Sequence, residues 1–310
     1  MTMRIGLVDL DTSHPQNWIP IERELGHEVA GLWDGGAVHP SDYVDKFAED
    51  HKIARRYDSL EAMAKDVDCA IIHGCDWDTH VDKARPFVEA GKSVLIDKPM
   101  AGNAHDLNQI VEWVRQGARI TGGSSLRFFR EIARWHGQPK EERGTPHTAL
   151  CGCAVDEFNY GIHAYSMLSA ILGQGIHSVR HLGAHVQRRI QVNWRDGRMG
   201  VLVVGQSANW LPFYATIVTE KVTAQLQADS ANLYRSLLEA TLPYLAGETD
   251  DPPLPVEVLI EPERAAIAAR KSWLHGNREV PLAELTDSAD GYDGHAFAVG
   301  YKKSRYPEGR

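Results

Sequence analysis

Acidic and imidazole side chains are concentrated just after the first apolar segment of the chain. Asp9, Asp11 and His14 follow residues 3–8. Two carboxylates and an imidazole can hold a divalent metal, which could act as a Lewis acid or activate water. The alternative is structural, with Asp11 or Ser13 capping a helix that begins nearby. Four residues around a later apolar segment could complete a metal site: His73, Asp76, Asp78 and His80.

A second group of residues has the composition of a proton-transfer site. Lys98 follows the apolar residues 92–97, and His163 lies near the start of another apolar stretch. A partly desolvated lysine beside carboxylates can serve as acid or base, because burial lowers its pKa and neighbouring anions raise it. Imidazole titrates near neutral pH, so His163 can take and return a proton during carbonyl–alcohol interchange. The alternatives are a surface lysine before a turn and a hydrogen-bonded histidine at a helix start.

Alternating strand and helix patterns over the first third of the chain would position both groups. Parallel pairing with right-handed crossovers follows from this order, so we predict a Rossmann-like, doubly wound α/β domain over residues 1–121. The carboxyl ends of its strands meet at one edge, which brings the polar residues after each strand together. The predicted strands are 3–8, 27–33, 67–73 and 92–97, and the predicted helices are 15–25, 41–51, 59–65, 78–90 and 104–116.

The pattern changes near residue 121, and residues 122–310 predict a second, α+β domain. A helix over 158–172 is followed by strand patterns with tight turns, including Asp196–Gly197, which indicates a mostly antiparallel sheet. Two helices near 231–246 and 257–275 come next, and the tail 286–310 predicts an ordered loop or an arm across the second domain. The strand patterns lie near 177–187, 189–195, 199–206, 213–220 and 222–228.

Three segments resemble the Gfo/Idh/MocA family, the oxidoreductases related to glucose–fructose oxidoreductase and inositol dehydrogenase. They are HVDKARPFVEAGKSVLIDKPMAG at 80–102, the Gly161–His163 segment and VNWRDGRMGVLVV. The resemblance implies an NAD(P)-dependent dehydrogenase of a sugar, polyol or related hydroxy compound, assembled as a homodimer or homotetramer. It implies catalytic roles at Lys98, His163 and Asn159. It implies cofactor contacts at Asp11, Thr12, Ser13, His14, Asp34, Cys75, Asp76, His80, Asp97 and Pro99.

The chain departs from the family's pattern at the dinucleotide fingerprint. Asp9, Asp11 and His14 stand at the positions of the three glycines, which provide a tight turn and close approach to the pyrophosphate. One carboxylate ~4 Å from one phosphate charge costs on the order of 4 kcal/mol at an effective dielectric near 20. Asp34, at the end of the second predicted strand, favours a dinucleotide instead, because an acidic residue there accepts hydrogen bonds from the adenosine ribose.

The catalytic positions depart from the pattern as well. Asn159 replaces an aspartate and cannot act as a general base, a role that Asp156 or Glu157 could take over. A second hypothesis is therefore a non-redox hydrolase, lyase or isomerase on the same scaffold, dependent on a metal or on no cofactor. A third is a binding protein without catalysis. Aromatic residues that could line a sugar cleft are Trp18, Trp77, Trp210 and Tyr160.

The amino-acid composition limits the classes of molecule that we expect this protein to bind. The net charge of −9 disfavours nucleic acid and anionic lipid as partners. The N-terminal residues lack a signal-peptide pattern, and apolar runs stay short of the ~20 residues that span a bilayer. Four cysteines in 310 residues do not make a disulfide framework, so a cytoplasmic location is expected.

Overall fold

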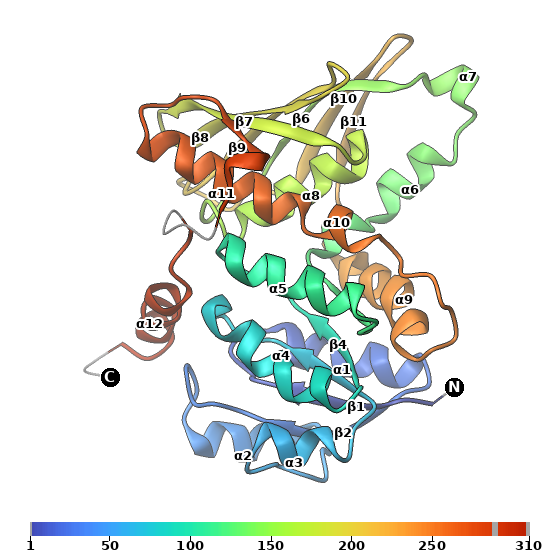
Figure 1. The fold of residues 1–310 in the computed structure, drawn as a ribbon, viewed down its shortest axis with the longest axis vertical. Coiled ribbons are helices and arrows are strands. Elements are labelled where there is room, and N and C mark those ends of the chain that lie inside the picture. Colours follow the sequence, from blue (N-terminus) through green and yellow to red (C-terminus); the bar gives the residue numbers. More distant parts are fainter. Residues whose placement is uncertain (1, 287–290, 308–310) are drawn as a thin grey trace.

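The computed structural model describes residues 2–286 and 291–307. It contains two sheets whose buried side chains contribute to one hydrophobic core (Figure 1). In these ranges the N-terminal sheet has five parallel strands in the order β2-β1-β3-β4-β5. This arrangement confirms the predicted doubly wound domain and adds β5 to it. The strands are β1 (Arg4–Val8), β2 (Glu28–Trp33), β3 (Cys69–Ile72), β4 (Ser93–Ile96) and β5 (Ile120–Gly122).

Helices cover both faces of this sheet because its strands are apolar on both sides. β3 and β4 are buried at every position, as expected of central parallel strands. Ser13 lies at the N-cap position of the first helix, but its side chain makes no capping hydrogen bond, so the capping role predicted for it is wrong. The helices are α1 (His14–Glu24), α2 (Ser41–Asp50), α3 (Leu60–Ala64), α4 (His80–Glu89) and α5 (Ala104–Arg115).

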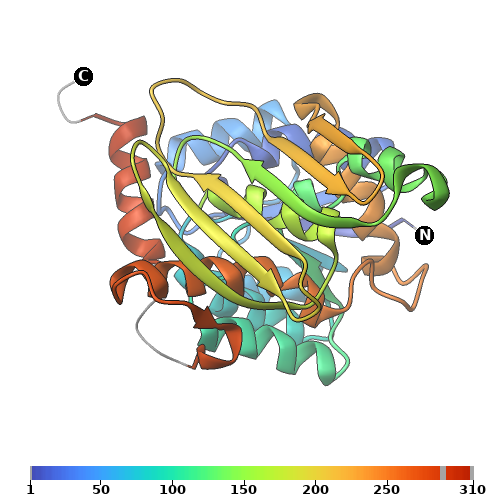
Figure 2. The ribbon, with the colours of Figure 1, turned by 90° about the horizontal axis from the view of Figure 1, so that it is seen from above.

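The second sheet has seven strands within the described ranges, in the order β11-β10-β6-β9-β8-β7-β12. It is antiparallel except for β6 beside β9, and Figure 2 shows one of its faces without a covering helix. Sequence patterns missed β6, whose partners β9 and β10 both come much later in the chain. The strands are β6 (Pro146–Gly152), β7 (Ile176–Ala184), β8 (Arg188–Trp194), β9 (Met199–Val204), β10 (Tyr214–Thr219), β11 (Thr223–Gln227) and β12 (Val280–Pro281).

Several helices connect the two sheets. α8 packs against β6 and α11 against β7. α9 returns to the N-terminal domain, where Leu237 and Leu242 pack in one cluster with Ile5 and Leu95. The remaining helices are α6 (Arg130–His136), α7 (Lys140–Arg143), α8 (Gly161–Leu172), α9 (Leu233–Leu245), α10 (Val256–Leu259) and α11 (Glu261–Leu274), with 3₁₀ turns η1 (Trp77–Thr79), η2 (Ser125–Arg127), η3 (Ser230–Asn232) and η4 (Leu282–Glu284).

The tail differs from its prediction. It was expected to be a loop or an arm across the second domain, whereas it forms helix α12 (Gly294–Arg305) against η1 of the first domain. Asp293 caps this helix, since its carboxylate accepts the Ala296 amide at 2.7 Å. Residues 287–290 and 308–310 of the predicted arm lie outside the described residues. No helix in the described part of the chain is long and apolar enough to cross a membrane.

Candidate active site

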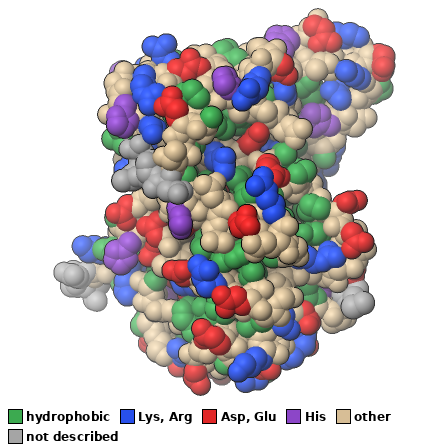
Figure 3. Space-filling view, viewed as in Figure 1, with side chains coloured by type: hydrophobic (Ala, Val, Ile, Leu, Met, Phe, Trp, Pro, Cys, Tyr) green, Lys and Arg blue, Asp and Glu red, His purple; other side chains and the backbone are tan. Residues whose placement is uncertain are grey.

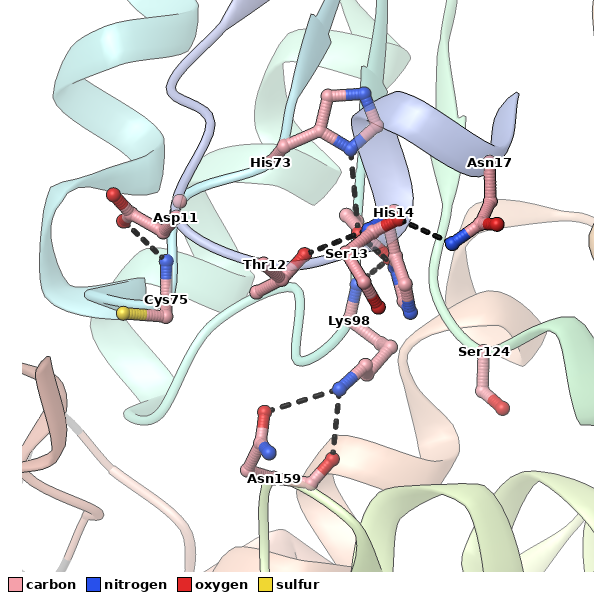
Figure 4. Close-up of polar contacts among 12 residues, drawn as sticks. Asp11, Thr12, Ser13, His14, Asn17, His73, Cys75, Lys98, Ser124 and Asn159 are labelled. Atoms are coloured by element: carbon pink, nitrogen blue, oxygen red, sulfur yellow. Dashed lines mark hydrogen bonds and ion pairs between the residues drawn. The ribbon is translucent and has the colours of Figure 1, made fainter. Parts of the chain in front are cut away.

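Lys98 lies at the end of β4 and reaches toward the second domain (Figure 4). Its Nζ donates to the backbone oxygen of Asn159 at 3.2 Å and to Asn159 Oδ1 at 3.0 Å. Burial lowers the pKa of Lys98, and the charges of Asp97 and Asp156 oppose that shift. The structure therefore brings together two of the three residues predicted to be catalytic. The amide at position 159 acts as an acceptor that holds the ammonium in place.

Asp97 joins two histidines beneath Lys98. Its Oδ2 lies 2.5 Å from His14 Nδ1 and 3.5 Å from His73 Nδ1, and its Oδ1 accepts the Lys98 amide at 2.7 Å. Burial would raise the pKa of Asp97, but the charges and hydrogen bonds of His14 and His73 hold it well below the usual range. Asp97 is therefore an anion at working pH. It fixes the His14 ring through Nδ1 and leaves Nε2 available.

His163 comes from the first turn of α8 and is fixed by a serine. Its Nδ1 lies 2.6 Å from Ser124 Oγ, which also accepts the Leu126 amide. This contact with Ser124 fixes the orientation of the His163 ring and leaves Nε2 as the nitrogen that the serine does not engage. Burial, together with the nearby Lys98 and His14, lowers the pKa of His163 well below the usual range. His163 is therefore neutral over the physiological range.

His14, Lys98 and His163 share one cavity of about 170 Å³ between the domains. Tyr160 and Trp210 line it, as predicted, whereas Trp18 and Trp77 are buried in the core. Tyr234, contributed by α9, stands edge-on to His14 with ring centroids 5.0 Å apart, and no sequence pattern indicated it. The cavity is lined by His14, Lys98, Ser125, Tyr160, His163, Trp210, Phe213, Ser230, Leu233 and Tyr234.

The turn between β1 and α1 is filled by its own carboxylates. Asp9 adopts φ 65°, the left-handed conformation that glycine would normally take. Its Oδ2 pairs with Lys83 Nζ at 2.6 Å, and its Oδ1 accepts the Gly35 amide at 3.1 Å. Asp9 is 1% exposed. A glycine at this position would carry no charge, and the charge of Asp9 is neutralised by Lys83 of α4, which no sequence pattern indicated.

Asp11 bonds across the sheet edge. Its Oδ2 accepts the Cys75 amide at 2.8 Å, which ties the turn after β1 to the loop after β3 (Figure 4). The side chain is fully buried, and Oδ1 has no hydrogen-bond partner among the described residues. Burial, reinforced by the charge of Asp9, raises the pKa of Asp11 to about 7. Asp11 therefore carries much less charge than an exposed aspartate.

The other residues predicted to contact a cofactor have partners within the chain. Asp34 accepts the amides of Leu10 and Gly36 at 2.9 and 2.8 Å. Both ring nitrogens of His80 lie within hydrogen-bonding distance of backbone oxygens, Nε2 2.9 Å from that of Gly74 and Nδ1 3.2 Å from that of Met100. Their predicted ligand roles stay predictions. Thr12 accepts the His14 amide, Ser13 precedes α1, Asp76 accepts the Asp78 amide, and Pro99 follows Lys98 in a cis peptide.

The metal site considered from the sequence is not formed. Asp9, Asp11 and His14 bind Lys83, Cys75 and Asp97 respectively, so their side chains point to different partners. Among the described residues, no group of three or more His, Cys, Asp and Glu side chains is placed to hold a metal ion. Close spacing in the sequence did not bring these side chains to one point, because successive residues of a turn point in different directions.

Comparison with known proteins identifies the first domain. Residues 5–122 match the model of an oxidoreductase family with an NAD-binding Rossmann fold, GFO_IDH_MocA. The trans-1,2-dihydrobenzene-1,2-diol dehydrogenase of Xenopus tropicalis is 30% identical over 93 residues, which are 30% of this chain and 27% of that protein. The putative oxidoreductase YceM of Salmonella typhimurium is 28% identical over 146 residues, 46% of this chain and 44% of that protein. The chain thus spans less than half of either relative.

Solved structures extend the likeness to both domains. The scyllo-inositol dehydrogenase of Lactobacillus casei, solved with NAD(H) and scyllo-inositol, has a TM-score of 0.76 at 15% identity. It covers 92% of this chain and 100% of its own. A probable dehydrogenase of Thermotoga maritima has a TM-score of 0.78 at 17% identity, with the same coverage. At such identities the likeness establishes the shared fold.

Proposed function

We propose that this chain, whose residues 5–122 match the GFO_IDH_MocA family of oxidoreductases, acts on a hydroxyl-bearing carbon of a sugar, polyol or related hydroxy compound. One observation carries the proposal: His14, Lys98 and His163 come from three separate elements and line the same cavity. Each has a fixed partner in Asp97, Asn159 or Ser124. Such preorganised polar groups are the usual means of proton-transfer catalysis.

The reaction that these groups support best is proton transfer next to a carbonyl group, as in isomerisation or epimerisation. His14 Nε2 removes the proton from the hydroxyl-bearing carbon, and the C–H electron pair forms the double bond of an enediol. The carbonyl π electrons move onto oxygen, where Lys98 and His163 donate hydrogen bonds. The hydroxyl proton passes to the former carbonyl oxygen, which becomes the new hydroxyl group. His14 returns its proton to the neighbouring carbon, so the carbonyl group is re-formed on the carbon that first carried the hydroxyl. No electrons are gained or lost overall, so the step needs no co-reactant.

A second candidate is an NAD(P)-dependent dehydrogenase of the same class of compound, which the family membership favours. Lys98 and His163 would then exchange the proton of the substrate hydroxyl. The residues of the fingerprint turn do not fit the cofactor as they stand. Asp11 is fully buried where the backbone would approach pyrophosphate, and the Asp34 carboxylate already accepts two amides. We therefore assign no step to a dinucleotide.

Exchange of carbon-bound hydrogen in D₂O separates the two candidates. Aldoses, ketoses, keto-inositols and hydroxy acids would be incubated with the protein and followed by ¹H NMR, without and with NAD or NADP. We expect loss of the signal adjacent to a carbonyl without added dinucleotide, and no such loss in His14→Gln. Turnover that occurs only when a dinucleotide is added would overturn the isomerase proposal and favour the dehydrogenase. Absence of exchange and turnover across the panel would contradict both.

We also propose that the chain forms a homo-oligomer in the cytoplasm and takes a small molecule as its partner. The uncovered face of the second sheet supports the first point, since apolar residues there are only partly buried in one chain. Basic and acidic side chains are interspersed over the face drawn in Figure 3, unlike a nucleic-acid-binding surface. Light scattering after chromatography would test the assembly, and a monomer would contradict it. The apolar residues of this sheet face are Leu150, Val201, Val203 and Val218.

A further inference from the structure

The C-terminal segment 291–307, here called the C-terminal latch, crosses the carboxyl edge of the parallel sheet. One end contacts the loop after β3 and the other contacts the loop after β2. Those loops flank the point between β1 and β3 where the strand order reverses. In open α/β sheets this crevice is where a nucleotide binds. The latch therefore lies on the nucleotide side of the sheet.

The first end of the latch is closely fitted to its site. Asp78 Oδ2 accepts the Gly294 amide at 2.7 Å and the His295 amide at 3.3 Å, so a carboxylate stabilises the N-terminus of α12. A Cβ at Gly294 would lie 2.8 Å from Asp76 Oδ1 and from the Trp77 amide nitrogen, so only glycine allows this approach. The Trp77 indole N–H donates to the Tyr292 backbone oxygen at 3.0 Å.

The other end of the latch holds the loop after β2. The Tyr306 hydroxyl lies 2.7 Å from His39 Nδ1. Between the two ends, Ala298 forms a buried apolar cluster with Val38 and Cys75, one from each loop. A nucleotide base entering between these loops would have to displace that cluster.

The turn beneath the latch is filled independently of it. Asp11 links the ends of β1 and β3 through the Cys75 amide, and Asp9 is paired with Lys83. These carboxylates belong to the turn itself, so opening the latch would not remove them. Phosphate binding needs free backbone amides and an approach without side chains at this turn. Here the buried side chains of Asp9 and Asp11 fill that approach, and the Leu10 amide is already bonded to the Asp34 carboxylate.

We infer that Asp9, Asp11 and the C-terminal latch replace the dinucleotide, so that this member of the family does not bind NAD or NADP. The aspartates occupy the pyrophosphate side of the crevice, and α12 occupies the adenosine side. Asp9, Asp34 and one oxygen of Asp11 are already bonded to groups of the chain itself. The inference concerns the sheet edge and does not depend on the reaction proposed for the cavity.

Calorimetry on the full chain with NAD⁺, NADH, NADP⁺ and NADPH tests the inference. We expect no saturable heat at millimolar dinucleotide for the wild type. The same result is expected for Asp78→Ala, which weakens the latch, and for the matched control Asp82→Ala, whose side chain is 82% exposed. Micromolar binding to the wild type would overturn the inference. Binding gained only in Asp78→Ala would overturn it too, since the latch would then be a movable lid.

Hydrogen–deuterium exchange gives a second readout without any substrate, so it stays informative if the proposed reaction fails. We expect slow exchange of the α12 amides, unchanged by millimolar NADH. Faster exchange in α12 on adding NADH would show displacement of the latch by cofactor and would contradict the inference. If Asp78→Ala does not fold, the wild-type exchange experiment alone decides the question.

Discussion

Two regions along the same sheet edge use similar residues in opposite ways. Over β1, β2 and β3, the carboxylates of Asp9, Asp11 and Asp34 bind groups of the chain itself. Over β4 and the start of α8, Lys98 and His163 are also held by neighbours but line a cavity. Residue type alone does not distinguish these regions. What distinguishes them is whether a polar side chain, once positioned, still faces a space that a ligand can enter.

Replacing Lys98 is the strongest test of the cavity as the reactive region. Lys98→Met removes the ammonium that donates to the forming oxyanion, so turnover of a substrate found by NMR exchange should fall on the order of 10³-fold. Initial rates would measure this, with Lys65→Met, an exposed lysine on the first domain, as the matched control. Equal rates in Lys98→Met and Lys65→Met would show that the reaction does not take place in the cavity.

The pair of His14 and Asp97 tests whether the turn after β1 contributes to the cavity at all. His14→Gln removes the proposed base and should lower kcat on the order of 10²-fold with little change in KM. Asp97→Asn keeps the shape but removes the anion that orients the ring, so a fall of about tenfold is expected. Steady-state kinetics would measure both, beside the exposed His177→Gln.

A structural role alone would give a different result. Loss of folding in His14→Gln would lower the amount of active enzyme, while the rate per folded molecule and its pH dependence would stay as in the wild type. Circular dichroism and active-site titration therefore accompany the kinetics. Wild-type kcat in folded His14→Gln would assign His14 to the filled region instead of the cavity.

The parallel sheet could be predicted from the sequence because its signals are local. Short apolar runs alternate with amphipathic stretches that end at Gly91 and Gly117, both of which have positive φ. β6 could not be predicted, because a seven-residue strand is defined here by partners from distant parts of the chain. Helix α12 was missed although Asp293 caps it locally, because the η1 segment against which it packs, including Asp78, lies more than 200 positions away.

The site was predictable only in part. Lys98, Asn159 and His163 were found through family-like segments, and the structure brings Lys98 and Asn159 into contact. The link between His14 and Asp97 joins two strand ends and has no spacing signal. Tyr234 reaches the cavity because α9 packs back on the first domain. Which carboxylates are already bound within the chain depends on partners such as Lys83, and a sequence does not show that.

The pH dependence of stability tests the region over β1, β2 and β3, where Asp11 is bound within the chain. Its pKa is near 3.8 in the unfolded chain and about 7 when folded. Between these values the unfolded chain has lost the proton while the folded chain keeps it, so the free energy of unfolding falls as pH rises from about 4 to 7. The asparagine of Asp11→Asn does not ionise, so this variant does not show that fall in the free energy of unfolding. It should be more stable than the wild type at pH 8 by on the order of 2–4 kcal/mol, and similar at pH 4.

Thermal unfolding at pH 4, 6 and 8 measures this difference, with Asp82→Asn as an exposed control. The difference in Tm between Asp11→Asn and the wild type should grow with pH and level off above 7. A constant difference across the range would mean that Asp11 is ionised in the folded protein. The turn would then hold a full negative charge and would need another counter-charge besides Lys83.

The smallest expected effect concerns the far end of the C-terminal latch and asks whether the two regions are independent. Tyr306→Phe removes the hydroxyl that contacts His39, which should weaken the latch by about 0.5–1.5 kcal/mol. Hydrogen exchange of the α12 amides should then quicken by up to about tenfold. Tyr301→Phe is the matched control, because the Tyr301 hydroxyl bonds to Arg305 within the same helix. Exchange in α8, which carries His163, should stay unchanged, since the contact that is lost joins the latch only to the loop after β2. Faster exchange in α8 would mean that the filled edge and the cavity open together, and the latch would then help to hold the reactive groups in place as well as filling the crevice.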